Sequence, residues 1–421
     1  MMNARRCLEA TVLGGCTFVL SAALLPLVLA PGDTPMEGNP IWKLILAASY
    51  LGVSAILLSD YRQTWLCIEN NPLLVAMVFF ALLSCLWAYT PALVLQRSVA
   101  VLGATLFGLA LASRFSLEDQ LRLLSWVFRI IAVLSLLCVL LAPRIGIASG
   151  EQDGYWRGIF GHKNGLGQIM AIAILVEWLL PAKTRLSKFL NFATILLCAI
   201  LLFFSNSITA MIAITASLIF IQVYRFTRGS LRVPMFAIVS IIALVITSSV
   251  LLLATDNAAV TAALGRTSSL TGRTEIWQWV MYFAQDRPIL GYGYSGFWGG
   301  AAPESIALND RLGFQVMYSH NGYLDIFLTL GAVGLLLSLL QIGVGIKRAF
   351  YRSERGASSV DYWPLAFVFY FAVHNVAECT ILTQDLEWSI FVAAIVGTGT
   401  LLAAESATNK DFLRLQTEQY S

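Results

Sequence analysis

Long apolar stretches separated by short polar turns dominate the hydrophobic pattern of the chain. A helix needs about 20 apolar residues to cross the hydrocarbon layer of a bilayer, and stretches of that kind predict about 12 transmembrane helices here. They cover residues 8–30, 41–59, 72–89, 92–113, 123–141, 164–181, 189–204, 207–224, 234–254, 319–346, 362–379 and 386–404. We therefore expect an all-α, polytopic membrane protein, with residues 1–421 forming a single integral membrane domain.

The composition narrows the class of protein further. Of the 421 residues, 58% are apolar and only 12% are charged, and the mean hydropathy is +0.75. Charge is too scarce to cover the surface of a water-soluble fold, which excludes a soluble enzyme, a disordered chain and a secreted disulfide scaffold. The net charge of +3, from 27 basic and 24 acidic residues, is too small to indicate a nucleic-acid partner.

The distribution of Lys and Arg predicts the orientation in the membrane. Basic residues such as Arg5, Lys183 and Lys347 concentrate in the segments on the side of the N-terminus. Because cytoplasmic loops carry the excess of Lys and Arg, both termini are expected in the cytoplasm, with the protein in the cytoplasmic (inner) membrane. The apolar run after MMNARR is too long for the core of a signal peptide and is expected to be retained as the first span.

One connection, residues 255–318 between the ninth and tenth expected spans, is much longer than most of the others. A long loop in an otherwise economical chain is usually functional, and this one is expected to be periplasmic. Its apolar positions 276, 277, 280, 281 and 283 predict an amphipathic helix lying along the outer membrane face. The string GYGYSG that follows matches a nucleotide fingerprint by chance, because no strand precedes it, and predicts a flexible aromatic loop.

All three histidines fall near the outer ends of expected spans. His162 precedes the sixth span, His320 starts the tenth, and His374 lies about one turn inside the eleventh. A lone interfacial histidine is usually a filler at the headgroup level, but three on one face indicate a site. His374 and Glu378 share one helix face, yet the chain has no His-rich cluster, no Asp-x-Asp and no CxxC, so we expect neither a metal nor a cofactor.

Several basic residues are expected close to these histidines. The outer segment 142–163 contains Arg157 and Lys163, and the long loop 255–318 contains Arg273 and Arg287. They suit either anchoring to lipid phosphates or a clamp on a phosphate or diphosphate. Arg97 lies inside the fourth expected span, where a charge needs a cavity or a partner unless it snorkels to the surface.

Three regions of the sequence resemble the O-antigen ligase and polymerase superfamily, and the resemblance is closest to exopolysaccharide production proteins of the ExoQ type. They are RGIFGHKNGLG (157–167), GRTEIW (272–277) with RPILGYGYSGF (287–297), and SHNGYLDIFLTLGAVG (319–334). The resemblance implies a membrane-embedded, GT-C-like glycosyltransferase that is metal-independent and inverting. Its donor would be a glycan carried by undecaprenyl diphosphate, and its acceptor another glycan. A flippase and a chain-length regulator are the further partners implied.

The same resemblance assigns roles to individual residues. Arg273 matches the basic residue near the diphosphate, and His320 matches the catalytic base. Ligases of the superfamily commonly carry Ser-x-Ser-Arg at one outer turn, whereas this chain has Ile208 after Ser207, which favours a polymerase. The further residues expected to bind substrate are Arg97, Arg157, His162, Lys163, Asn164, Ser205, Ser207, Arg287, Asn321, His374 and Glu378.

Two alternatives to the polymerase remain open from the sequence. The first is an O-antigen ligase, which would transfer the lipid-linked glycan to lipid A core or another acceptor. The second is a 12-span transporter. The sequence shows no repeat between its two halves and its ionisable residues cluster at one face, and both features are unusual for a transporter.

Overall fold

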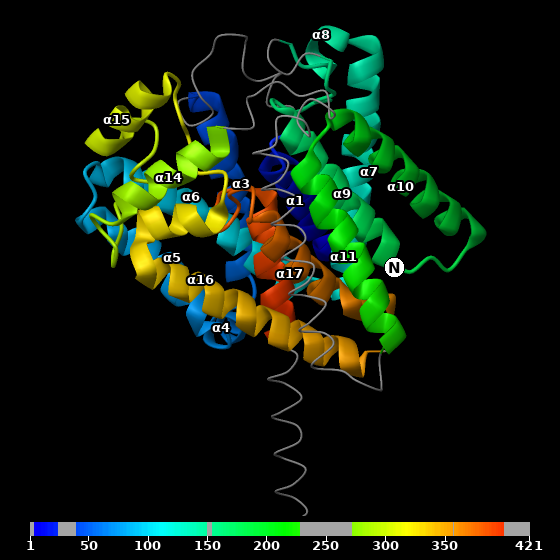
Figure 1. Cartoon of the computed structure of the whole chain (residues 1–421). Coiled ribbons are helices and arrows are strands. Elements are labelled where there is room, and N and C mark those ends of the chain that lie inside the picture. Colours follow the sequence, from blue (N-terminus) through cyan, green and yellow to red (C-terminus); the bar gives the residue numbers. More distant parts are fainter. Residues whose placement is uncertain (1–3, 24–38, 150–153, 228–271, 357, 400–421) are drawn as a thin grey trace, which may run out of the picture.

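The computed structural model describes residues 4–23, 39–149, 154–227, 272–356 and 358–399, and within them the regular structure is helical without strands. Figure 1 shows the arrangement of these helices. The first half contains α1 (Ala4–Leu20), α3 (Pro40–Leu58), α4 (Tyr61–Glu69), α5 (Pro72–Leu83), α6 (Pro91–Arg114), α7 (Leu117–Leu141), α8 (Pro143–Gly146), α9 (Lys163–Leu179) and α10 (Arg185–Ser205). The second half contains α11 (Ile208–Thr227), α14 (Gly272–Ala284), α15 (Pro303–Leu312), α16 (Gly322–Arg355), α17 (Trp363–His374) and a last helix, Leu386–Gly399.

The chain is a multi-pass membrane protein, as its apolar pattern predicts. Six of the described helices are long and apolar enough to cross a bilayer, namely Pro40–Leu58, Pro91–Arg114, Leu117–Leu141, Arg185–Ser205, Ile208–Phe226 and Gly322–Arg355. A seventh results if α4 and α5, bent by 89°, form one broken span. The expected spans around α1, α9 and α17 coincide with shorter helices. The span expected at 234–254 and the loop residues 255–271 lie outside the described residues, and the total of about 12 stays a prediction.

Local sequence explains where several helices begin. Ser116 caps α7 by accepting a hydrogen bond from the Asp119 amide at 3.3 Å, and Thr184 forms a capping box with Ser187 at the start of α10. Proline occupies the first turn of α3, α5, α6 and α15, where its missing N–H costs nothing. These signals fix helix ends but not the contacts between helices.

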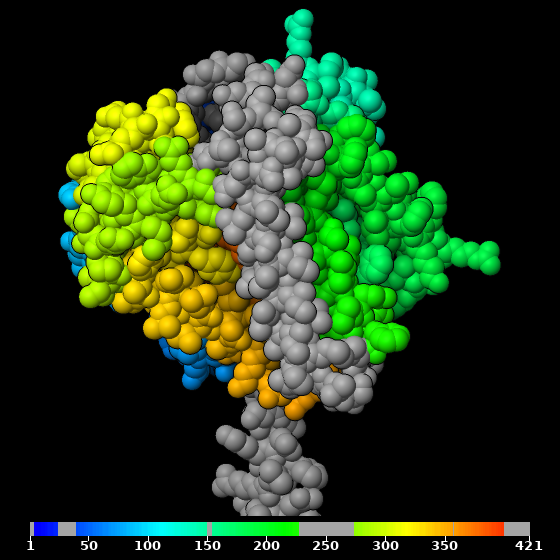
Figure 2. Space-filling model, in the orientation of Figure 1, coloured from blue at the N-terminus to red at the C-terminus, as the bar shows by residue number. Residues whose placement is uncertain are grey.

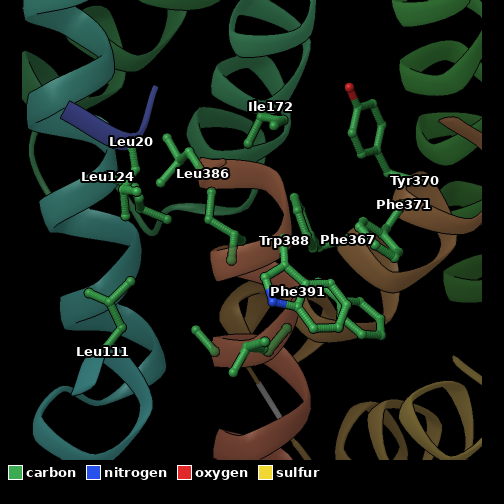
Figure 3. Close-up of a cluster of buried hydrophobic side chains, with 14 of the residues drawn as sticks. Leu20, Leu111, Leu124, Ile172, Phe367, Tyr370, Phe371, Leu386, Trp388 and Phe391 are labelled. Atoms are coloured by element: carbon green, nitrogen blue, oxygen red, sulfur yellow. The ribbon is translucent and has the colours of Figure 1, made fainter. Parts of the chain in front are cut away.

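A buried aromatic cluster joins α17 to the last helix. The rings of Phe371 and Phe391 stack with centroids 4.2 Å apart, and Trp388 donates a hydrogen bond to Thr105 of α6 at 2.9 Å. Figure 3 shows Phe371 and Phe391 beside Trp388. In the same region α17 packs on α9, α11 and α16. The segment between α17 and the last helix is therefore anchored at both ends by rigid, buried elements.

The described part of the long loop, residues 272–318, packs against α16 as a small layer of its own. Ile276, Val280 and Phe283 of α14 are buried together with Phe297 and other aromatic residues. A helix is present where the sequence predicts one, and these three apolar residues are buried against protein. Its position relative to the membrane stays a prediction. The predicted flexible aromatic loop is wrong, because its rings form this core. Figure 2 shows α14 and α15 continuous with the surface of α16.

A kink in α16 receives this layer. Gly331 has φ 66° and ψ −166°, which interrupts the helix. The amide of Ala332 then donates to the Pro288 carbonyl at 2.8 Å, and the amide of Tyr292 donates to the Leu328 carbonyl at 3.1 Å. Glycine adopts this backbone conformation without the steric penalty of a Cβ atom. The kink thus docks the loop that carries Arg273 onto the helix that follows His320.

A buried ion pair lies far from that layer, among α7, α9 and α10. Arg129 and Glu177 form two hydrogen bonds, at 2.7 and 2.9 Å, and the Glu177 side chain is fully buried. Ser125 donates to the same carboxylate at 2.6 Å, and Asn191 accepts from Arg129 at 2.8 Å. A charge inside the membrane is expensive unless it is paired, and this network satisfies both partners.

Candidate functional site

A polar cavity of about 340 Å³ lies where α6, α9, α16 and the segment after α17 meet. Tyr294, Ser295 and Trp298 of the long loop complete its wall. Its polar lining also includes Arg97, His162, Asn164, Gln168, Asp325, Glu378, Thr380, Thr383, Gln384 and Asp385. Four of the residues predicted from the sequence, Arg97, His162, Asn164 and Glu378, therefore meet in one cavity.

Glu378 connects this cavity to Arg273. The carboxylate lies 3.6 Å from the Arg273 guanidinium and accepts a hydrogen bond from the Asn164 side chain at 3.1 Å. Arg273 also donates to the Ala377 carbonyl at 3.1 Å. Residues from α9, α14 and the segment after α17, far apart in the sequence, are thereby held together. Arg273 contacts the lining residue Glu378 but does not itself line the cavity. We call the region beside the cavity that contains Arg273 and His320 its rim.

His320 also lies beside the cavity, against another of its lining residues. Its ring centroid lies 4.4 Å from that of Tyr318, a cavity-lining residue, and its buried Nδ1 has no hydrogen-bond partner among the described residues. The backbone is held at φ 56°, in the left-handed region. Trp277 fixes the preceding carbonyl of Ser319 by donating to it at 2.9 Å. A histidine with a left-handed backbone and a ring nitrogen that has no hydrogen-bond partner is suited to a functional role.

The surroundings of His320 and of His162, which lines the cavity, oppose protonation of both rings. Burial, together with the charges of Arg273 and His162, lowers the pKa of His320 to about 3. Burial also lowers the pKa of His162, and Lys163, Arg273 and Arg157 add to that effect. A site that opposes additional positive charge is one that favours an anion. The rim near Arg273 is therefore an electrostatic match for a phosphate or diphosphate group.

Comparison with known proteins points to the same region of the chain. A family model described as O-Antigen ligase matches residues 193–339. Over that segment the chain is therefore similar to O-antigen ligases. The exopolysaccharide production protein ExoQ of Rhizobium meliloti (strain 1021) is 29% identical over 114 residues. That match covers 26% of this chain and 25% of the relative. Arg273 and His320 both lie inside the segment that resembles the superfamily.

Other residues from the strings that resemble the superfamily bind to the protein itself. Arg157 donates to the Ile145 carbonyl at 2.8 Å. Lys163 donates to the Asn206 carbonyl at 3.2 Å and lies 4.2 Å from the Tyr155 ring centroid. These two cations influence the cavity through the pKa of His162, but neither lines it.

The Ser-x-Ser turn is also a packing element. Ser205 and Ser207 are buried, and the Ser205 hydroxyl donates to the Leu202 carbonyl at 2.7 Å and accepts from the Ser207 amide at 3.3 Å. Asn206 between them adopts the left-handed conformation that ends α10. The turn packs near Gly167 of α9 and lies outside the cavity lining.

The two remaining arginines differ in position. Arg287 lies against the rings of both Tyr89 and Tyr292, at 4.4 and 4.8 Å from their centroids, and donates to the Trp87 carbonyl at 3.3 Å. It ties the long loop to the segment before α6. Arg97 does line the cavity and donates to the Ser295 carbonyl and, at 3.3 Å, to the Ser295 hydroxyl. The cavity thus resolves why a charge is tolerated in this helix.

His374 and Asn321 contact protein groups near the cavity and do not line it. His374 is 1% exposed, and its Nδ1 lies 3.1 Å from Glu387, which also accepts from Gln168 at 2.6 Å. Asn321 caps α16 by accepting hydrogen bonds from two amides at 3.1 Å. Both residues hold the backbone segments that line the cavity.

Sequence analysis missed several residues of the cavity wall. Asp325, Asp385 and Tyr318 line it. Asp325 lies within the string 319–334, where the resemblance assigns it no role, and Asp385 and Tyr318 belong to no motif that would single them out. Asp385 does have a recognisable signal, since a carboxylate directly before an apolar helix is typical of a helix cap. It accepts a hydrogen bond from the Trp388 amide at 3.0 Å. The sequence indicates that cap but not the cavity beside it.

Proposed function

We propose that the protein is a polymerase of polysaccharide repeat units carried on undecaprenyl diphosphate, working at the outer face of the cytoplasmic membrane. The observation that supports the proposal is that Arg273 and His320 both lie beside one polar cavity, Arg273 against its lining residue Glu378 and His320 against its lining residue Tyr318. Both belong to the segment that resembles the O-antigen ligase and polymerase superfamily. A polyprenyl-linked donor would reach such a rim directly from the bilayer.

Arg273 is proposed to hold the diphosphate of the donor. Its guanidinium is positioned by Glu378 and the Ala377 carbonyl, so little rearrangement is needed to present its other donor groups. A guanidinium matches phosphate oxygens with paired hydrogen bonds and remains charged at every relevant pH. As the glycosidic bond to the diphosphate breaks, negative charge grows on the leaving oxygen, and a preorganised cation stabilises that charge.

His320 is proposed to accept the proton of the acceptor. In the reaction, the acceptor hydroxyl oxygen bonds to the anomeric carbon of the donor, and the carbon–oxygen bond to the diphosphate breaks with its electron pair leaving on the diphosphate. The hydroxyl proton moves to the imidazole, and the configuration at the anomeric carbon inverts. Burial, and after it the charge of Arg273, lower the pKa of His320, and a bound diphosphate would offset the second of these causes. The imidazole would then become a stronger base once the donor is present.

A ligase remains the second candidate, and each has an observation in its favour. The family model that matches the chain is described as O-Antigen ligase. The polymerase is favoured because the Ser205 turn lacks the arginine common in ligases and because a relative is named for exopolysaccharide production. The acceptor distinguishes the two: a polymerase extends a second lipid-linked glycan, whereas a ligase transfers the chain to lipid A core or another terminal acceptor. A flippase and a chain-length regulator are the partners expected for the polymerase.

The deciding experiment is an analysis of lipid-linked glycans in a strain that lacks the protein. Loss of a polymerase leaves single repeat units on the lipid, whereas loss of a ligase leaves long chains. We expect single units, and we expect Arg273→Gln or His320→Asn to fail to restore polymer. Asparagine tolerates the left-handed backbone at position 320, so that variant removes the imidazole without adding strain.

The matched control for Arg273 is Arg144→Gln, which makes the same chemical change at an exposed position. It is expected to restore polymer fully. Normal polymer from either Arg273→Gln or His320→Asn, at equal protein levels, would refute the assigned roles. Accumulated long chains in the deletion strain would replace the polymerase by the ligase.

A further inference from the structure

We propose that the cavity binds the terminal sugar of the acceptor glycan and selects a neutral or amino sugar over an acidic one. This inference rests on the proposed glycosyl transfer and adds the location and chemical class of the second substrate. The inference follows from the different charges of two neighbouring regions, because carboxyl groups line the cavity whereas Arg273 lies at its rim.

The charges inside the cavity differ from those at the rim. Three carboxylate residues, Asp325, Glu378 and Asp385, are among the lining residues, and Arg97 and the neutral His162 are the basic ones. The Arg97 guanidinium donates to Ser295 at the cavity wall. Because Glu378 is paired with Arg273, an anionic ligand inside the cavity would face two further carboxyl groups, Asp325 and Asp385, against the single charge of Arg97. The diphosphate is matched by the rim near Arg273, and the cavity is left for a group without negative charge.

Asp385 gives an independent indication of the same bias. Burial and the nearby Glu387 raise its pKa to about 7. The surroundings already oppose one negative charge at this position, so they would oppose a second one brought by a ligand. A sugar hydroxyl, in contrast, can donate to a carboxylate or accept from a protonated one.

The remaining lining has the features of a carbohydrate site. Tyr318 is 39% exposed and presents a ring against which a sugar could stack, while Gln384 and Thr383 offer donors and acceptors for hydroxyl groups. Trp298 lines the cavity beside Asp325, and its indole interacts with that carboxyl group. A volume of about 340 Å³ lies at the lower end of small-molecule pockets, which span about 300–1,000 Å³. It suits the end of a glycan and not a long stretch of it.

A metal ion is the other ligand that carboxylates attract. Within the described ranges, no three His, Cys, Asp or Glu side chains are grouped so that they could hold one. The carboxylates are instead spread around the wall, where they can meet different hydroxyl groups of one ring.

The test measures sugar binding without any donor. The full chain is reconstituted in lipid nanodiscs, and saturation-transfer NMR is recorded with methyl β-glucoside, its 2-amino analogue and methyl β-glucuronide. We expect the neutral and amino glycosides to bind, and the glucuronide to bind at least about tenfold more weakly, the effect of one like-charge contact. Asp385→Asn should narrow that difference, because it removes a carboxylate while keeping a good helix cap.

Two further variants make the result specific to the cavity. Thr383→Trp should fill the cavity and abolish binding of all three glycosides. Asp310→Asn makes the same chemical change as Asp385→Asn at an exposed position on α15, and it should leave binding unchanged. Equal binding of the glucuronide, absence of binding by all three glycosides, or binding that survives Thr383→Trp would overturn the inference. Because no donor is present, selective sugar binding together with normal polymer in the deletion strain would refute the proposed transfer and leave the sugar site standing.

Discussion

Gly331 offers the sharpest test of how the loop carrying Arg273 is held in place. Its φ of 66° breaks α16, and the freed amides of Ala332 and Val333 donate to the carbonyls of Pro288 and Ile289 at 2.8 and 3.3 Å. A Cβ atom added at this position would collide with the backbone of Ile289. Gly331→Ala should therefore either strain the kink or push the loop away from α16.

The expected loss of stability can be estimated from those contacts. A left-handed backbone costs about 1–2 kcal/mol for alanine relative to glycine. If the loop moves to relieve the collision, two backbone hydrogen bonds are lost at about 0.5–1.5 kcal/mol each. Gly331→Ala should thus destabilise the folded protein by about 2–5 kcal/mol. Thermal unfolding of the full chain in one detergent, at one scan rate, measures the difference, and polymer yield in cells should fall with it.

Gly343 provides a matched control in the same helix. It is exposed, and a Cβ atom there would meet nothing within 4 Å. Gly343→Ala should leave stability unchanged or raise it by up to about 1 kcal/mol, because alanine favours a helix. If the two variants unfold at the same temperature, the kink does not dock the loop in the way described here.

Two further predictions concern buried charge and pH. Glu177→Gln should destabilise the protein by about 3–5 kcal/mol, because it leaves Arg129 without its carboxylate, and replacing both residues by apolar ones should recover most of that loss in thermal unfolding. His320 should make stability fall between about pH 6.5 and pH 3, because only the unfolded state takes up its proton in that window. His320→Asn should flatten this dependence, and an unchanged slope in its melting temperatures would contradict the assigned electrostatic surroundings.

Much of the fold was accessible from the apolar pattern alone. Stretches such as 41–59 and 123–141 coincide with α3 and α7, because membrane helices satisfy their backbone hydrogen bonds locally and expose apolar side chains to lipid. The placement of histidines at one end of their spans likewise led to His162, which lines the cavity, and to His320, which contacts the lining residue Tyr318. His374 fits the same pattern but faces Glu387 inside the protein. Spacing along one helix places a residue at a depth in the membrane and leaves its partner undetermined.

The features that the sequence could not predict depend on contacts between distant segments. Trp298 and Phe297 look like an exposed aromatic loop until α14 and α15 are known to cover them. Arg287 looks like a phosphate ligand, but two tyrosines lie against it, one of them about 200 residues earlier. Asp385 belongs to no motif. In each case, the deciding neighbour comes from another element, so periodicity gives no information about it.

The separation of charge at the site bears on a problem particular to a polymerase. Under the proposed function, donor and acceptor both carry a diphosphate and a glycan, so shape alone hardly distinguishes them. A rim with Arg273 attracts the diphosphate of the donor, while a cavity with Asp325 and Asp385 repels that group and admits a sugar. Under this proposal the rim binds the donor through its diphosphate, and the cavity binds the acceptor through its terminal sugar. Glu378 contacts Arg273 while lining the cavity, so one carboxylate lies between the two proposed binding regions.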